Sequence, residues 1–267
     1  MIKFFTSFDR IDYPLRYVTV NPFTFQRFPK WFNCYGYQVK EILLDTGVDT
    51  LFHIYNLKDY PKHHINNYIN IISYFNKLAK KHDIKVIVTI PDIPSDYPSR
   101  EHLYPYNVIR TIEYIEYFKE KVIPRYDNVI FMPVVQGKKD SWLSLVTTYK
   151  KYYNIYKDFE IVAVGIVCVS TKYKKLANII LEFDQITDHN YHVFGPSIKA
   201  IRLVYDKVKS MYSFDSSAFV KTYCKYKYRE YKNRVHALQE FLKKNASKHN
   251  LLISFRIRSI FFSITPR

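Results

Sequence analysis

The chain has 267 residues, of which 48% are hydrophobic, and a formal net charge of +17 from 41 Lys and Arg against 24 Asp and Glu. This length suits a single barrel of roughly 250 residues with one large core. Such a basic chain should attract polyanions, first nucleic acid and second an anionic membrane surface, although the charge could serve solubility alone.

Three widely spaced cysteines, Cys34, Cys168 and Cys224, argue against a disulfide framework and a cysteine-based zinc site. The longest apolar runs are about half of what a bilayer span needs, and the segment before Asp9 lacks a signal-peptide core. We therefore expect a cytoplasmic protein with no membrane partner, metal or cofactor.

Short β-branched runs alternate with longer helical stretches. The expected strands are Tyr17–Val20, Glu41–Leu44, Ile84–Ile90, Asn128–Val135, Glu160–Val164, Tyr191–Phe194 and Ser210–Phe214. Apolar residues at three- and four-residue spacing predict helices over Ile65–Lys81, Asn107–Ile123 and Trp142–Tyr156. This alternation indicates parallel βαβ units and favours a (β/α)8 TIM barrel over residues 1–216, with an open doubly wound sheet as the alternative. Residues 217–267 would form a closing helix and a basic C-terminal extension.

Polar residues and glycines gather just after the predicted strands. Turn chemistry explains any one of the glycines, which are Gly47, Gly137, Gly165 and Gly195. Four polar residues follow different strands at the same end: Asp45, Asp92, Gln136 and Asp215. Each Asp alone could cap a helix, but the set predicts a site at the C-terminal rim of a barrel. Carboxylates and an amide suit a flat, hydrogen-bonding ligand such as a guanine-like base.

Six short segments in this order resemble motifs of the tRNA-guanine transglycosylase family. They are Leu44-Asp45-Thr46-Gly47, Pro91-Asp92, Pro133-Val134-Val135-Gln136-Gly137, Val162-Ala163-Val164-Gly165, His192-Val193-Phe194-Gly195 and Ser213-Phe214-Asp215-Ser216. The resemblance implies a base-exchange enzyme in which Asp215 attacks C1′ of a nucleotide and Asp45 is the general acid/base. It implies that Asp92 and Gln136 bind the base edges. The implied base-binding set also includes Gly137, Gly165, Ile166, Phe194 and Gly195, with Phe194 packing on the base face.

Several positions depart from the family pattern. Asp49 stands near the family's aromatic stacking position, and Ile166 replaces a second glycine and would narrow the base site. Only Cys224 lies beyond Asp215, so the family's cysteine-rich zinc site is missing. These departures keep two other hypotheses open, a catalytically inactive relative that binds nucleic acid and an unrelated barrel enzyme for a small phosphorylated substrate. The expected partners are tRNA or DNA and guanine or a 7-deazaguanine derivative, and a homodimer is compatible with the resemblance.

The C-terminal segment is the most basic part of the chain, since residues 216–267 carry +10 of the total charge of +17. Lys221, Lys225, Arg229 and Lys232 fall on one predicted helical face and would contact the nucleic-acid backbone, unless they form a solvated outer face. The histidines lack metal-site spacing, and we expect His192 to line the site or to hydrogen-bond within the rim.

Overall fold

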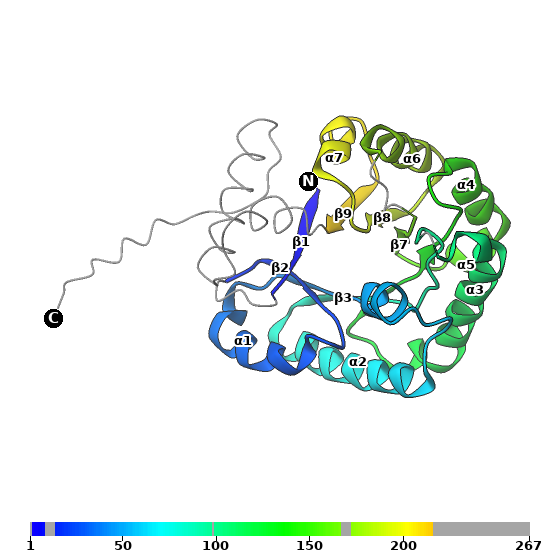
Figure 1. The fold of residues 1–267 in the computed structure, drawn as a ribbon. Helices are drawn as coiled ribbons and strands as arrows, with labels where there is room; N and C mark the ends of the chain where they lie inside the picture. The colour runs from blue at the N-terminus through cyan, green and yellow to red at the C-terminus, as the bar shows by residue number, and fades with distance from the viewer. Residues whose placement is uncertain (1, 9–13, 98, 167–171, 216–267) are drawn as a thin grey trace.

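The protein is a parallel barrel surrounded by helices (Figure 1). The computed structural model describes residues 2–8, 14–97, 99–166 and 172–215. Every strand pair is parallel, and the order in the sheet is β5-β4-β3-β2-β1-β9-β8-β7-β6. The strands are β1 Lys3–Ser7, β2 Tyr17–Val20, β3 Glu41–Leu44, β4 Lys85–Thr89, β5 Ile130–Met132, β6 Val134–Val135, β7 Ile161–Val164, β8 Asn190–Val193 and β9 Met211–Asp215.

Strands β5 and β6 are two halves of one strand, separated only by Pro133. Strand β5 pairs with β4, and β6 pairs with β7. The carbonyl of Met132 accepts a hydrogen bond from the N–H of Ile90 at 2.9 Å, and the carbonyl of Pro133 accepts one from Ala163 at 2.8 Å. Pro133 has no N–H to donate, so the strand changes neighbour at this residue. The two sheet ends thus meet, which confirms the predicted TIM-like barrel and shows that the open-sheet alternative is wrong.

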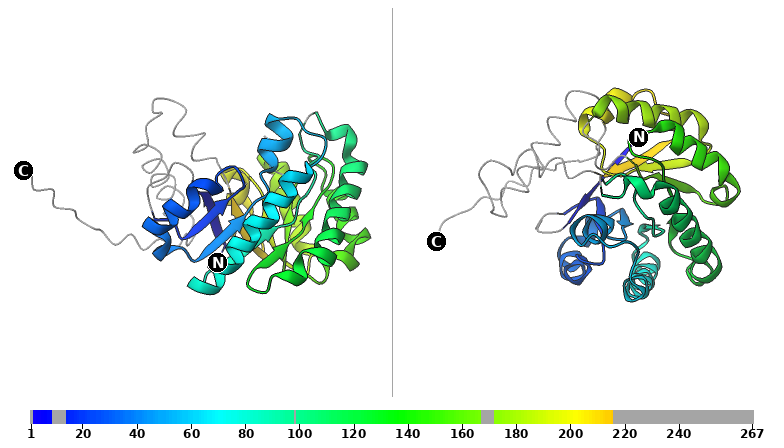
Figure 2. Two further views of the ribbon diagram at one scale, coloured as in Figure 1. Left: turned by 90° about the horizontal axis from the view of Figure 1, so that it is seen from below. Right: turned by 45° about the vertical axis from the view of Figure 1, so that its right-hand side comes forward.

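The helices form the outer layer of the barrel, and Figure 2 shows them from two further sides. They are α1 Phe28–Tyr35, α2 Lys62–His82, α3 Tyr104–Lys121, α4 Trp142–Lys151, α5 Tyr153–Tyr156, α6 Tyr173–Ile186 and α7 Ile198–Val204. Short 3-10 turns cover Phe25–Arg27, Gly36–Gln38, Glu101–Leu103 and Ile123–Arg125, and a π-helical turn covers Asp49–Ile54. Helix α2 ends where Asp83 adopts a left-handed conformation (φ 51°), and Lys80, Lys81 and His82 complement its C-terminal dipole.

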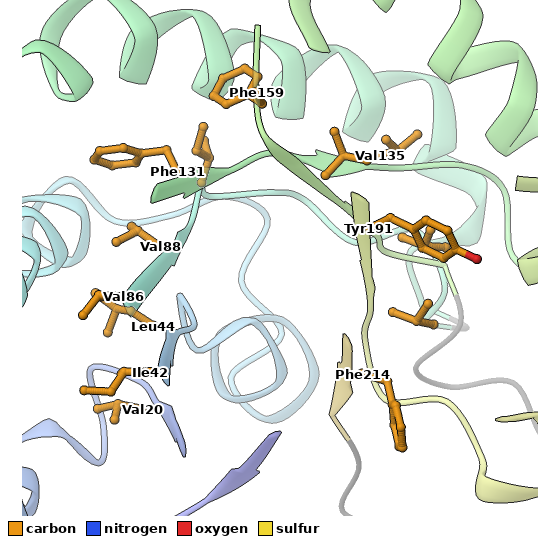
Figure 3. Close-up of a cluster of buried hydrophobic side chains, with 14 of the residues drawn as sticks. Val20, Ile42, Leu44, Val86, Val88, Phe131, Val135, Phe159, Tyr191 and Phe214 are labelled. Atoms are coloured by element: carbon orange, nitrogen blue, oxygen red, sulfur yellow. The ribbon is translucent and has the colours of Figure 1, made fainter. Parts of the chain in front are cut away.

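Two buried clusters follow from the alternation of side chains along each strand. The larger one lies between strands and helices and includes Leu44, Val88 and Phe214 (Figure 3). The smaller one fills the barrel interior with Phe5, Tyr17, Leu43, Ile87, Met132, Val134, Ile161 and Ala163. Both faces of a strand are therefore buried, which explains why β7 reads Ile-Val-Ala-Val without a polar residue.

The N-terminal mouth of the barrel is closed by a charged network beneath this interior cluster. The Lys3 ammonium pairs with the Glu41 carboxylate and also donates to the Tyr212 hydroxyl at 2.6 Å. Tyr212 in turn donates to the other oxygen of Glu41 at 2.6 Å. Three strands that are distant in sequence are thereby joined at one end of the barrel.

The sequence-based strands match the observed ones closely, with two differences. Strand β1 was not predicted, and the expected strand Asn128–Val135 is broken by Pro133. The described strands span Lys3 to Asp215, whereas the expected closing helix and basic extension, residues 217–267, lie outside the described residues. None of the helices described is long and apolar enough to cross a membrane.

Candidate active site

Four polar residues meet at the C-terminal mouth of the barrel, as the sequence predicted. Asp45 directly follows β3, Asp92 lies just beyond β4, Gln136 directly follows β6, and Asp215 is the last residue of β9. The Asp45 carboxyl interacts electrostatically with Asp215 and with Asp92, and Asp92 is hydrogen-bonded to Gln136. Because all strands are parallel, their carboxyl ends bring these side chains together.

Asp92 and Gln136 form a buried pair. The Gln136 amide donates through Nε2 to Asp92 Oδ2 at 2.5 Å, and both side chains are almost inaccessible to solvent. Burial raises the pKa of Asp92 to about 8, and the negative charges of Asp45 and Asp96 add to this rise, while the Gln136 hydrogen bond opposes it. Asp92 is therefore mainly protonated at neutral pH.

Gly165 makes room for Gln136. A Cβ atom on Gly165 would lie 2.5 Å from Gln136 Nε2 and 2.7 Å from Val134 Cγ1, well inside van der Waals contact. Gly137 has a different role, because a Cβ there would lie 2.9 Å from Ser144 Oγ and 3.0 Å from the backbone nitrogen of Leu145. The close approach of helix α4 thus explains the glycine at this position, and the base contact of Gly137 stays a prediction.

Asp45 is poised to exchange a proton near neutral pH. Burial and, to a smaller extent, the charge of Asp215 raise its pKa to about 7, against the opposing effect of hydrogen bonds from the backbone of Thr46 and Gly47. Gly47 has a φ of 82°, a conformation that suits glycine and turns the chain sharply after β3. A group with a pKa near the working pH can both donate and accept a proton.

Asp215 is held by two neighbours from strand β8 and the loop that follows it. Its Oδ1 accepts a hydrogen bond from the N–H of Gly195 at 2.7 Å, and it lies 3.5 Å from His192 Nε2. The other ring nitrogen of His192 hydrogen-bonds the Ser213 hydroxyl at 2.8 Å, so His192 does bond within the rim as expected. The positive φ of Gly195, 59°, aims its N–H at the carboxylate. The closeness of His192 to Asp215 was not predicted.

Phe194 and Ile166 have different surroundings. Phe194 is half-buried above the interior cluster, with its ring centroid 4.6 Å from that of His192. Ile166 is fully buried in the outer core between strands and helices. The Ile166 side chain therefore packs in the outer core and not among the residues of the barrel interior, and its backbone contact with a base stays a prediction.

Several buried polar atoms around the site have no hydrogen-bond partner among the described residues. They are Thr19 Oγ1, Thr89 Oγ1, Gln136 Oε1 and His192 Nε2. Thr19 and Thr89 follow the interior residues Tyr17 and Ile87 by two positions and so face the barrel axis. Buried polar groups are normally hydrogen-bonded. These four atoms therefore offer hydrogen-bonding capacity in the layer above the interior cluster.

Two buried tyrosines that the sequence did not single out fix the loops that carry the aspartates. The Tyr68 hydroxyl of helix α2 lies 3.0 Å from the Leu44 carbonyl and 2.8 Å from the Thr89 carbonyl, at the ends of β3 and β4. The Tyr60 hydroxyl donates to the Asp92 carbonyl at 3.1 Å and lies 2.9 Å from Thr46 Oγ1. A tyrosine on the buried face of a predicted helix is the signal that could have revealed Tyr68.

Asp49 stands at the family's aromatic position, but an aromatic pair lies beside it. The Tyr97 hydroxyl donates to Asp49 at 3.1 Å, and the Tyr97 ring stacks on His53 with centroids 5.1 Å apart and planes inclined by 10°.

Exposed lysines follow three neighbouring strands, β6, β7 and β8, on one part of the rim. Lys138, Lys174, Lys175 and Lys199 are exposed in the βα loops or in the first turns of the following helices. The predicted backbone-binding residues Lys221, Lys225, Arg229 and Lys232 lie outside the described part of the chain. Among the residues that the structure describes, no group of three or more His, Cys, Asp or Glu side chains could hold a metal ion.

Comparisons with known proteins add no identification. Neither a scan against protein-family models nor a search of curated proteins found a match. The resemblance to transglycosylases thus rests on the sequence motifs alone.

Proposed function

We propose that this protein is a base-exchange transglycosylase that replaces guanine, or inserts a 7-deazaguanine derivative, in tRNA or DNA. The observation that supports it most is the meeting of Asp45, Asp92, Gln136 and Asp215 at one mouth of a parallel barrel. Burial raises the pKa values of two of these carboxyl groups, Asp45 and Asp92, and buried carboxyl groups with raised pKa values are characteristic of active sites.

Asp92 and Gln136 would recognise the edge of the base. The ionised Asp92 carboxylate accepts hydrogen bonds from N–H groups, and the unpaired Gln136 Oε1 accepts another. Guanine presents adjacent N–H donors on one edge, which suits this set of acceptors. The backbone at Gly165 and Ile166 lies beside Gln136, and Phe194 offers an apolar ring near the barrel axis.

The chemistry would proceed through a covalent sugar–enzyme intermediate. The Asp215 carboxylate attacks C1′ of the target nucleotide, the C1′–N9 bond breaks with its electron pair going to guanine, and protonated Asp45 donates a proton to the leaving base. The incoming base then loses its N9 proton to the Asp45 carboxylate and attacks C1′, which releases Asp215. A pKa of about 7 suits Asp45 to both steps. The N–H of Gly195 holds the attacking carboxylate in position, and His192 Nε2 lies 3.5 Å from it.

The polymer would be held by basic loops. Lys138, Lys174, Lys175 and Lys199 lie on one part of the rim and would contact phosphates beside a nucleotide that has left its stack. The net charge of +17 favours association with nucleic acid in general.

Incorporation of radiolabelled guanine into tRNA and into duplex DNA tests this proposal and distinguishes the two polymers. Asp215→Asn should abolish incorporation and leave polymer binding nearly intact, because an amide is isosteric but a poor nucleophile. Asp206→Asn, an exposed carboxyl on the opposite face of the barrel, is the matched control and should remain active.

A denaturing gel identifies the nucleophile. Wild-type protein incubated with substrate should give a protein–nucleic acid adduct that Asp215→Asn lacks. An adduct that persists in this variant would place the nucleophile elsewhere, with Asp45 the next residue to test. Polymer binding without incorporation by the wild-type protein would favour the alternative of a catalytically inactive relative.

A further inference from the structure

Two adjoining cavities lie on the N-terminal face, opposite the candidate active site. One of about 710 Å³ opens at the starts of strands β1 to β4 and is lined by Lys3, Arg16, Lys40 and Lys85. The other, of about 640 Å³, lies between α1 and the end of α2. Lys40, Asp83 and Ile84 line both cavities, so the two form one continuous depression, which we name the basic groove.

The basic groove is strongly positive. Seven Lys and Arg side chains line it, against the carboxylates of Glu41 and Asp83. Glu41 is already bound by Lys3 and Tyr212, so it neutralises little else. Lys40, Lys77, Lys80 and Lys81 are all exposed and form no ion pair within the described part of the chain. Their positive charge is therefore available to a ligand.

Helix capping explains only part of this charge. Lysines in the last turn of α2 stabilise the negative end of the helix dipole, which accounts for Lys80 and Lys81. The dipole does not account for Arg16 and Lys40, which precede strands β2 and β3. Cations from separate elements thus converge on one depression, as expected for a surface that binds several phosphates.

An aromatic side chain completes the groove. Tyr37 lines the second cavity and is 74% exposed, which is unusual for a ring of this size. Cations along a groove together with an exposed ring are the elements that bind single strands, since phosphates follow the charges and a base stacks on the ring. A bilayer surface is flat and would not enter a depression.

We propose that the basic groove binds a single-stranded nucleic acid segment through its phosphates, with one base stacked on Tyr37. This site is separate from the C-terminal mouth and does not depend on base exchange there. Its position lets the protein hold a nucleic acid segment away from any nucleotide that reacts.

Fluorescence anisotropy with a labelled oligothymidylate of about 12 nucleotides tests the proposal, because this probe contains no guanine for the C-terminal mouth. The groove variant combines Lys40→Gln, Lys80→Gln and Lys81→Gln. Its affinity should fall tenfold or more, and the slope of log affinity against log salt should become shallower by about 2, since each phosphate contact on a single strand contributes about 0.7.

The matched control combines Lys150→Gln, Lys157→Gln and Lys207→Gln. These lysines are exposed near helix ends on the same face, outside both cavities, so the charge removed is equal. The control should bind within about twofold of wild type at the same salt concentration, because it loses only long-range attraction. Both variants keep the full chain, including the basic segment 217–267, so the comparison isolates the groove.

Tyr37 gives an independent measurement. Tyr37→Ala should weaken oligothymidylate binding by about 5- to 100-fold without changing the salt slope, and Tyr37→Phe should retain binding because its ring still stacks. Equal losses in the groove variant and its control would overturn the proposal. So would loss of binding to anionic phospholipid vesicles in the groove variant with no change for the oligonucleotide, because the groove would then be a membrane contact.

Discussion

Replacing Asp92 by asparagine should stabilise the protein increasingly as the pH rises. Asp92 loses its proton near pH 3.8 in the unfolded chain and at about pH 8 in the folded protein. Between these values the folded state binds more protons than the unfolded state, so the wild-type stability falls as the pH rises and levels off above about 8. The substituted side chain carries no such charge, and its amide can donate to Gln136 Oε1, which lacks a partner among the described residues.

The size of the effect follows from the pKa shift. One pKa unit corresponds to about 1.4 kcal/mol, so the stability advantage of Asp92→Asn should grow by up to that amount per pH unit. We expect a total gain of about 2 to 5 kcal/mol by pH 8, since some water entry reduces the cost of burial. Urea unfolding of both proteins at each pH from 5 to 9 gives the difference directly.

An exposed carboxyl group whose pKa is lowered, and not raised, serves as the control. The Lys119 ammonium lowers the pKa of the exposed Asp158, so Asp158→Asn should show no pH-dependent difference between pH 5 and 9. A constant stability difference for Asp92→Asn across this range would refute the reasoning, because it would mean that Asp92 is ionised in the folded protein at pH 5.

Three more predictions concern the two ends of the barrel. The affinity for guanine, measured by calorimetry, should rise about tenfold per pH unit up to about pH 8, because the base binds the ionised form of Asp92. An affinity that stays constant from pH 6 to 8 would contradict this prediction. Gly165→Ala should lower the free energy of unfolding by about 1 to 3 kcal/mol and should weaken guanine binding, because the new Cβ displaces Gln136. The control is Gly36→Ala, whose Cβ would lie 2.8 Å from the Phe32 ring. It should lower the stability without changing the affinity for guanine. Tyr212→Phe should lower the free energy of unfolding by about 1 to 3 kcal/mol, because Glu41 loses a hydrogen bond, and base exchange should persist. Thermal or urea unfolding measures this change. An unchanged stability would show that the charged network at the N-terminal mouth contributes little.

The barrel and the positions of its polar rim could be predicted because strand ends are local features. Asp45, Gln136 and Asp215 each follow an apolar run, and parallel strands must place these ends together. Strand β1 was missed because Lys3, Thr6 and Ser7 flank its short apolar run, and its pairing with β2 and β9 makes it a strand. The break at Pro133 was missed because the surrounding run is otherwise apolar.

Contacts between distant segments were beyond sequence reasoning. The link from Tyr68 to the carbonyls of Leu44 and Thr89 depends on how helix α2 packs on the barrel. The outward direction of Ile166 depends on the phase of strand β7, which the motif alone does not fix. The aromatic pair of His53 and Tyr97 comes from two loops whose separation in sequence hides their contact.

The pairing of β1 with β9 has a consequence for the proposed base exchange. Lys3 lies opposite Ser213, so this pairing brings together segments from nearly the two ends of the described chain and costs loop-closure entropy. In the sheet, Asp45 follows a strand on one side of this pairing, and Asp215 ends a strand on the other side. A partly folded chain that forms its other strands and helices but lacks this pairing would lack the proposed acid–nucleophile pair. A measured rate of base exchange would then report the fraction of chains with a closed barrel.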